Sequence, residues 1–257
     1  MAGTSKKRTS ALAPDFRERL IAEATASAER GGQWLTPLCI VAACGARPAE
    51  LAKGVRLRRG SAPDTIQIVI AGAKVNDKQR RGIPIRQVTI STRTAGGESQ
   101  PWASHLLELV ADGPVRYELP SPSAFSHHVR NASMKLWPRR KSHASPYSFR
   151  HALAAEMKTT GTDPVEIARV MGHASTRSQE AYGWRRRRKG GKGPVVSAET
   201  SQEPRRTTRD GKLDRFKVAS KIKTQVANKA AMLAKLASRP VAAPVARAPS
   251  RPRAARP

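Results

Sequence analysis

The stretch TIQIVIAGAKVNDKQRRGIPIRQVTI, residues 65–90, sets the fold class of this 257-residue chain. Ile66, Ile68 and Ile70 alternate with other residues, and the same period of two returns after Gly82, as in half-buried strands. Between the two runs lie polar residues, among them Lys74, which indicate a turn. We therefore expect a β-hairpin here, with a third strand if residues 55–58 also pair.

Helical patterns flank this hairpin on both sides. WLTPLCIVAACG (residues 34–45) is largely apolar and predicts a buried helix, followed by a turn and a short helix through Glu50 and Leu51. Downstream, apolar residues recur at helical spacing in three segments: PWASHLLELV (101–110), SAFSHHVRNASMKLW (123–137) and YSFRHALAAEM (147–157). Asp163 begins a last helix, which ends at Gly172, and Asp15 opens an early one. The expected class is α+β: a mostly helical domain with a small antiparallel sheet.

The charge balance points to a polyanionic partner. The chain has 48 Lys and Arg against 19 Asp and Glu, a net charge of +29, so nucleic acid is the first partner to consider and an anionic membrane the second. The longest apolar run, residues 38–44, is too short to span a bilayer, and we expect a cytosolic protein. Cys39 and Cys44 point in different directions on a helix, which favours buried thiols over a disulfide or a metal site.

The positive charge is concentrated in the C-terminal third. Residues 185–257 hold 21 Lys and Arg against 4 Asp and Glu, a net charge of +17, and end in RPVAAPVARAPSRPRAARP. Such composition favours disorder. We expect a short N-terminal arm and helix at 1–32, a globular domain at 33–189, and a basic, largely disordered tail at 190–257. A candidate helix at 212–238 would lie along DNA or dock its apolar side on a second protomer.

Four segments occur in an order that resembles a known family. They are GARPAEL (45–51), the hairpin IAGAKVNDKQRRGIPI (70–85), SPYSFRHALAAEM (145–157) and MGHASTRSQEAY (171–182). Taken singly, Arg47 or Lys74 is an ordinary surface residue. Together, the segments resemble the boxes of the tyrosine recombinases, or phage-type integrases, over about residues 33–184. The resemblance implies the catalytic-domain fold of that family and site-specific cleavage and rejoining of DNA.

The resemblance also implies the site residues: Tyr182, Arg47, Arg150, His173, Lys74 and Tyr147. Tyr182 would attack a DNA phosphate to give a 3′-phosphotyrosyl link, which needs neither ATP nor a metal. Arginine forks would neutralise the charge that develops on the phosphate oxygens, and His173 would bond to one of them. Lys74, which matches better than Lys78 because it ends the second strand, would protonate the departing 5′ oxygen.

Two features depart from the family. Tyr147 stands where a histidine is usual, and a phenol is a poor proton acceptor at neutral pH, so activity would be slower or would rely on His173 as the base. Complete members also carry a helical DNA-clamping domain before the catalytic one, for which about 30 residues are too few. Stable binding to DNA would then depend on a partner protein or on the basic C-terminal residues, which are the tail and the run before it: Arg185, Arg186, Arg187, Arg188 and Lys189.

The expected partners are double-stranded DNA, further copies of this chain on that DNA and an accessory DNA-bending protein, with no membrane. The resemblance implies a cytoplasmic, nucleoid-associated protein of a prokaryote. Two other functions stay open at this point. One is a DNA-binding protein that uses the fold without efficient catalysis, and the other is a type IB topoisomerase-like enzyme, which shares the chemistry without site choice.

Overall fold

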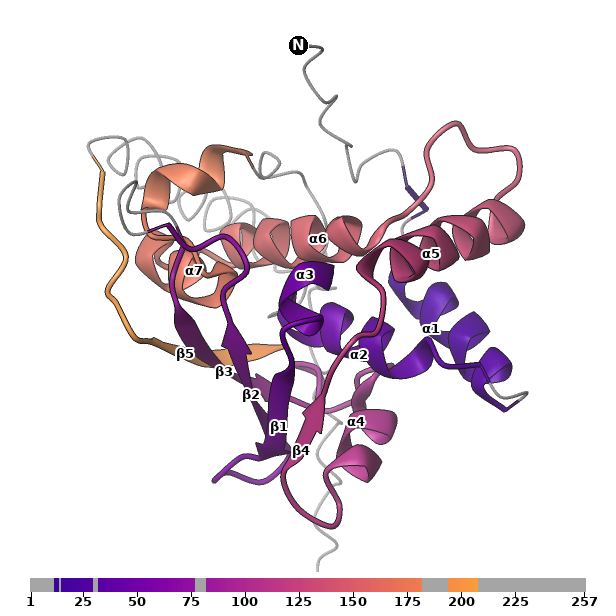
Figure 1. Cartoon of the computed structure of the whole chain (residues 1–257), viewed down its shortest axis with the longest axis horizontal. Coiled ribbons are helices and arrows are strands. Elements are labelled where there is room, and N and C mark those ends of the chain that lie inside the picture. Colours follow the sequence, from indigo (N-terminus) through magenta and orange to yellow (C-terminus); the bar gives the residue numbers. More distant parts are fainter. Residues whose placement is uncertain (1–11, 14, 30–31, 77–81, 182–193, 208–257) are drawn as a thin grey trace, which may run out of the picture. The chain divides into compact units, whose positions relative to one another are not determined.

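The computed structural model describes residues 12–13, 15–29, 32–76, 82–181 and 194–207 (Figure 1). Every described helix and strand lies within residues 1–211. The helices are α1 Phe16–Ala28, α2 Leu35–Cys44, α3 Pro48–Leu51, α4 Ala103–Leu109, α5 Pro122–Leu136, α6 Pro146–Thr159, α7 Pro164–Met171 and the 3-10 helix η2 Thr176–Ala181. The strands are β1 Val55–Arg59, β2 Thr65–Ala71, β3 Ile85–Ser91, β4 Val115–Tyr117 and β5 Val195–Thr200. Within the described residues, no helix is long and apolar enough to cross a membrane.

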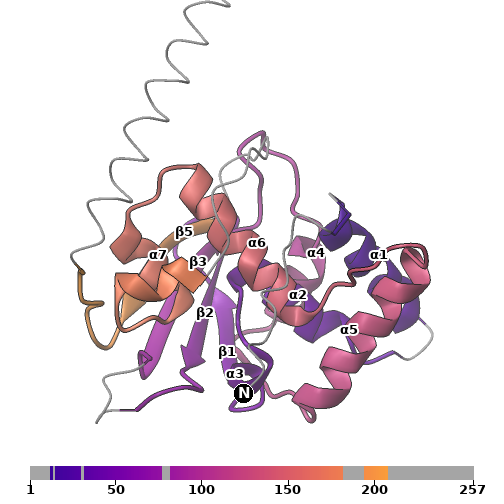
Figure 2. The same cartoon turned by 90° about the horizontal axis from the view of Figure 1, so that it is seen from above.

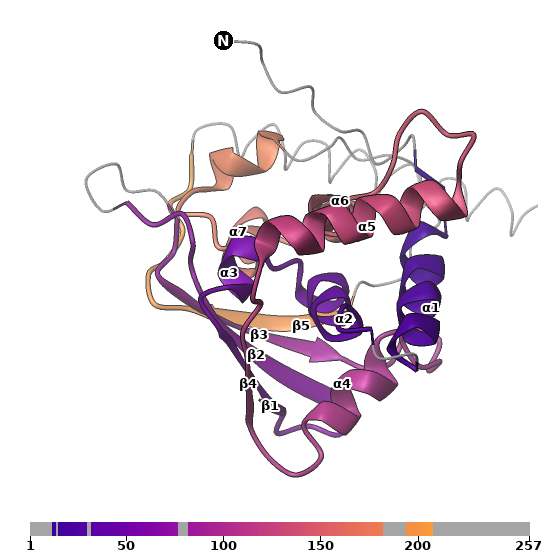
Figure 3. The same ribbon diagram turned by 45° about the vertical axis from the view of Figure 1, so that its right-hand side comes forward.

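The strands form one antiparallel sheet in the order β4-β1-β2-β3-β5. Its centre is the expected hairpin, in which Ile68 of β2 pairs with Val88 of β3, and β1 adds the expected third strand. The isoleucines of β2 and alternate residues of β3 are buried on one face, which the helices cover (Figures 1 and 3). The predicted α+β class, a mostly helical body with a small antiparallel sheet, is confirmed.

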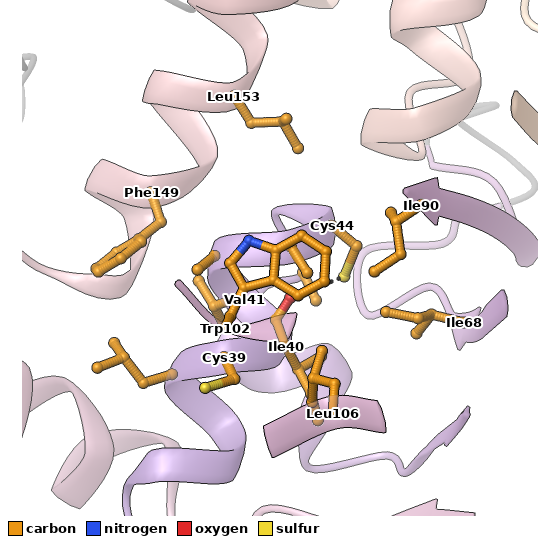
Figure 4. Close-up of a cluster of buried hydrophobic side chains, with 14 of the residues drawn as sticks. Cys39, Ile40, Val41, Cys44, Ile68, Ile90, Trp102, Leu106, Phe149 and Leu153 are labelled. Carbon is orange, nitrogen blue, oxygen red and sulfur yellow. Dashed lines mark hydrogen bonds between the residues drawn. The ribbon is translucent and has the colours of Figure 1, made fainter. Parts of the chain in front are cut away.

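Helix α2 is the centre of the hydrophobic core. Every residue of α2 except Thr36 is buried, because the helix is enclosed by the sheet and by α1, α4 and α6 (Figure 4). Seen from above, α6 lies between the sheet and the pair formed by α1 and α5 (Figure 2). Residues of α2, of the sheet, of α4 and its N-terminal neighbour, and of α6 meet in this core: Cys39, Ile40, Val41, Cys44, Ile68, Ile90, Trp102, Leu106, Phe149 and Leu153. This packing fixes the position at which α2 ends and the segment GARPAEL (45–51) begins.

The two cysteines lie inside this core, as predicted. Both thiols are free and buried. Burial raises the pKa of Cys39 to about 12 and that of Cys44 to about 11. The Cys44 thiol donates to the carbonyl of Ile40, 3.1 Å away, within the same helix.

Helix α1 belongs to the same packed body as α2. Phe16, Leu20 and Ile21 are buried in the common core, and the ring of Phe16 meets the ring of Phe149 edge-on at 5.2 Å. Arg17 also pairs with Glu156 of α6. Helix α1, which was predicted as part of a separate segment at 1–32, thus packs on the same core as the helices of residues 33–189.

Residues 194–207, which were predicted as part of the basic tail, contact the sheet and the segment that follows α7. Strand β5 pairs with β3 at the edge of the sheet, and the backbone of Arg205 bonds to Ala174 and Thr176. The segment VVSAET buries little, with only Ala198 fully inside, so its pattern hides the strand. It is held mainly by the N–H and C=O groups that β3 offers at its edge. The candidate helix at 212–238 lies outside the described residues.

Candidate active site

Three of the predicted site residues meet at one place, around the carboxylate of Glu50. Arg47 is the residue that begins α3, Arg150 lies in α6, and His173 follows the end of α7. The positive charges of Arg47 and Arg150 act on both Glu50 and His173. The fold thus brings the first, third and fourth sequence boxes into one buried cluster.

Glu50 holds the backbone and the side chain of Arg47. One carboxylate oxygen accepts from the Arg47 backbone N–H at 2.8 Å, and the other accepts from the Arg47 guanidinium. The first bond satisfies an N–H at the start of a helix, where no backbone carbonyl is in reach. The Arg47 side chain keeps 11% of its surface exposed, so this guanidinium lies at the boundary of the cluster.

A third arginine, Arg86, completes the cluster and has no counterpart among the predicted site residues. It lies on the buried side of β3, and its guanidinium donates to both Glu50 oxygens, at 3.1 and 2.7 Å. Burial alone would raise the pKa of Glu50, but the charge of Arg86, followed by those of Arg47 and Arg150, holds it well below its usual range. The sequence carries one signal for this residue. Arg86 is a charged residue in the alternating series of β3 whose other members, Val88 and Ile90, are buried.

Arg150 is fully buried, at 0% exposure, and caps two helices. It donates to the carbonyl of Gly45 at 2.7 Å and to the carbonyl of Met171. Gly45 ends α2 and Met171 ends α7, so the positive charge sits at the negative ends of two helix dipoles. In this conformation Arg150 therefore holds the two chain segments that carry Arg47 and His173.

His173 is also buried, and its ring is neutral. An Arg150 N–H lies 3.3 Å from Nε2, and because arginine can only donate, Nε2 is the acceptor and the ring proton is on Nδ1. Burial lowers the pKa of His173 well below its usual value, and the charges of Arg150, Arg47 and Arg86 lower it further. A ring with such a low pKa is a weak general base, which disfavours the base role considered for His173.

Lys74 and Tyr147 lie outside the buried cluster, on the surface. Lys74 does not end β2 as expected, because the strand ends at Ala71; it is exposed in the loop that follows. Tyr147 is 42% exposed at the second residue of α6, one helical turn before Arg150. Both side chains are therefore open to a ligand at the surface.

Tyr182 and residues 185–189 lie outside the described residues, but the segment that leads to Tyr182 is described. This segment is η2, which ends at Ala181. The side chain of Gln179 donates to the Pro164 carbonyl, and Lys158 donates to the Gln179 carbonyl at 2.7 Å. Burial lowers the pKa of Lys158 to about 8. These bonds attach η2 to α6 and to the start of α7.

The cluster is suited to an anion. Three guanidinium charges against one carboxylate leave a net charge of +2, because His173 is neutral. Buried positive charge of this kind attracts negative charge more strongly than it would in water. Among the described residues, no group of three His, Cys, Asp or Glu could hold a metal ion.

Comparisons with known proteins return recombinases and integrases. No known family model matches this chain, and no curated protein does. The chain is similar to XerA recombinase, with 17% identity and a TM-score of 0.42 over 66% of this chain and 58% of that one. It is also similar to Tn1549 transposon integrase in complex with a circular intermediate DNA, with 12% identity and a TM-score of 0.42. This match covers 71% of this chain and 63% of that one. The same integrase in complex with transposon right end DNA gives 13% identity and a TM-score of 0.40, over 67% of this chain and 61% of that one.

The chain thus spans 58–63% of the length of these solved chains. What the site can do follows from its own residues.

Proposed function

We propose that this chain is a tyrosine recombinase that cleaves and rejoins DNA strands through a covalent link to Tyr182. One observation carries the proposal: Arg47, Arg150 and His173, which come from three separate sequence boxes, meet in one cluster with a net charge of +2. The helix η2 leads from this cluster to the residue before Tyr182. A cationic cluster that neutralises the charge developing on the phosphate is what attack on a phosphodiester requires.

The proposed reaction conserves one phosphoester bond. The Tyr182 oxygen attacks phosphorus, the bond to the 5′ oxygen breaks, and a 3′-phosphotyrosyl link forms. The phenol proton passes to water, since the low pKa of His173 makes it a weak base. Lys74, exposed in its loop, gives a proton to the departing 5′ oxygen. Attack by the 5′ hydroxyl of another strand reverses these steps and rejoins the DNA.

The two arginines have different tasks in this proposal. Arg47, at the edge of the cluster, contacts the phosphate directly. Arg150 holds the ends of α2 and α7 and contacts the phosphate only if the Met171 carbonyl moves away from its guanidinium. Double-stranded DNA is the proposed substrate, and further copies of the chain and an accessory DNA-bending protein are proposed partners on it.

A covalent trapping assay tests the function. The protein is mixed with supercoiled plasmid that carries flanking DNA from its own locus, then denatured, and DNA attached to protein is measured. We expect an adduct with the wild type and none with Tyr182→Phe. Tyr117→Phe is the matched control, because Tyr117 lies in β4 of the sheet. An adduct that survives Tyr182→Phe would contradict the assignment of the nucleophile.

The burial of Arg150 and the presence of Tyr147 favour one second candidate, a protein that binds DNA without cutting it. Tight binding with no adduct on any supplied DNA would support that function. The next variant would then be Tyr147→His, which supplies an imidazole at the exposed start of α6. An adduct formed by this variant would support the enzymatic function over binding alone.

A further inference from the structure

We propose that Arg86 is a positioning residue that sets the orientation of Arg47 through the shared carboxylate of Glu50. The inference rests on the proposed function for its catalytic consequence, but its structural part stands on the described contacts. Arg86 occupies a position on β3 where the neighbouring inward residues are Val88 and Ile90. A buried ion pair is seldom more stable than apolar side chains of similar volume, so stability alone does not account for it.

The bonds of Glu50 explain what Arg86 does. A carboxylate has about four lone-pair positions. One oxygen of Glu50 accepts from the side chains of Arg47 and Arg86, and the other accepts from the Arg47 backbone and from Arg86. The two Arg86 bonds come from one planar guanidinium and reach both oxygens, so they hold the plane of the carboxylate in one orientation. With that plane held, the Arg47 guanidinium has one preferred orientation.

Arg86 also touches the other half of the site. A Cβ added to Gly172 would lie 2.6 Å from the Arg86 Nη1, so the guanidinium packs directly on the backbone next to His173. Gly172 has a φ of +62° at the end of α7, which favours glycine for a second reason. One side chain thus contacts the segments that carry Arg47 and His173.

The same residue fixes the base of the hairpin that carries Lys74. Arg86 pairs with Ile70, and the Gly72 N–H bonds to the Pro84 carbonyl at 2.7 Å, just beyond that pair. The hairpin loop therefore starts from a strand pair that Arg86 anchors to Glu50. Lys74, Arg47 and His173 all depend on this anchor for their relative positions.

The first experiment measures the position of Arg47 directly and needs no DNA. In protein with isotope-labelled arginine, the guanidinium N–H signals of Arg47 are assigned by their loss in Arg47→Lys. We expect separate, slowly averaging signals in the wild type, because Glu50 restrains the group, and averaged signals in Arg86→Met. The double variant Glu50→Gln with Arg86→Met, which removes both members of the Glu50–Arg86 ion pair together, should also average them and provides a second folded variant if Arg86→Met alone fails to fold. Unchanged Arg47 signals in the folded variants would overturn the proposal.

The second experiment measures single-turnover DNA cleavage. We expect Arg86→Met to lower the cleavage rate by about 10²-fold while DNA affinity stays within about twofold, and Arg86→Lys to restore part of the rate. In an Arg47→Ala background the same change should lower the rate by less than about threefold, because the two residues act as a unit. Multiplicative losses would mean that Arg86 does not act through Arg47. A wild type that forms no adduct contradicts the proposed function, while the signals of Arg47 still decide the role of Arg86.

Discussion

Arg150 illustrates how the role of a residue depends on its surroundings. The resemblance of its segment to a family box implies a guanidinium that faces a phosphate. In the structure its donors reach the carbonyls that end α2 and α7, and its surface is fully covered. A guanidinium can do this because its donors are fixed in a planar fork. The contact with His173 follows from the same geometry and keeps that ring neutral.

The neutral state of His173 predicts a loss of stability at mildly acid pH. Its pKa is lowered in the folded chain, so the unfolded chain binds a proton first as the pH falls below about 6.5. The free energy of unfolding should therefore decrease toward acid pH, by at most roughly 1.4 kcal/mol per pH unit from this group. Denaturant titrations between about pH 7 and pH 5 measure it, above the range where Glu50 would titrate.

His173→Asn should remove this part of the pH dependence. The matched control is His127→Asn, because His127 is exposed on α5. Equal pH profiles for the wild type and His173→Asn would mean that the pKa of His173 is the same in the folded and the unfolded chain.

At the scale of elements, the site is built from helix ends. The turn after α2 carries Arg47, the first turns of α6 carry Tyr147 and Arg150, and the end of α7 leads to His173. Gly45 and Gly172, with φ of +65° and +62°, end α2 and α7. Such ends let the chain turn sharply and leave carbonyls for a side chain to bond. That is why one arginine can join both helices.

The two glycines that follow α6 and α7 give a matched pair of substitutions. Gly161→Ala, at a φ of +76° with no atom within 4 Å, should lose only about 1–2 kcal/mol for the left-handed conformation. Gly172→Ala carries a similar strain and also displaces Arg86 from Glu50, a further loss of about 2 kcal/mol. Thermal and denaturant unfolding measure the difference. Equal losses would show that the Arg86 side chain moves aside without cost.

At the scale of the whole molecule, the chain after Tyr182 returns to the sheet. Strand β5 covers the edge of β3, and Glu203 and Arg206 pair with Arg169 and Asp163 at the two ends of α7. Removing all residues from 190 onward would therefore remove a strand and these ion pairs together. A test of the basic tail has to leave residues 194–207 in place.

Truncation after Thr207 should weaken DNA binding mainly through its salt dependence. Residues 208–257 hold 13 Lys and Arg against 2 Asp and Glu, and each DNA phosphate that the protein no longer neutralises reduces the slope of log K against log salt by about 0.9. Binding to a DNA duplex over a series of salt concentrations measures this slope. A full-length variant with glutamine at the tail's lysines and arginines is the control, and should behave like the truncation. An unchanged slope in both would exclude the tail from DNA binding.

Local patterns in the sequence were enough to predict the main elements. The alternation at 65–90, the apolar run of α2 and the capping signals of α7 each lie within one short segment, so the hairpin, the buried helix and the last helix were predictable. Arg47, Arg150 and His173 were found by their resemblance to family boxes, and the structure brings them together. The proposed roles of Lys74, Tyr147 and Tyr182 stay predictions.

The contacts that these residues make were decided by tertiary packing alone. Whether an arginine faces solvent or a helix end depends on packing between distant segments, and no local pattern reports it. The role of Arg86 and the strand β5 were not predicted from the sequence, for related reasons. The partner of Arg86 is a carboxylate from another element, and β5 forms because β3 has an open edge. Neither partner is encoded in the residues that surround Arg86 or β5 in the chain.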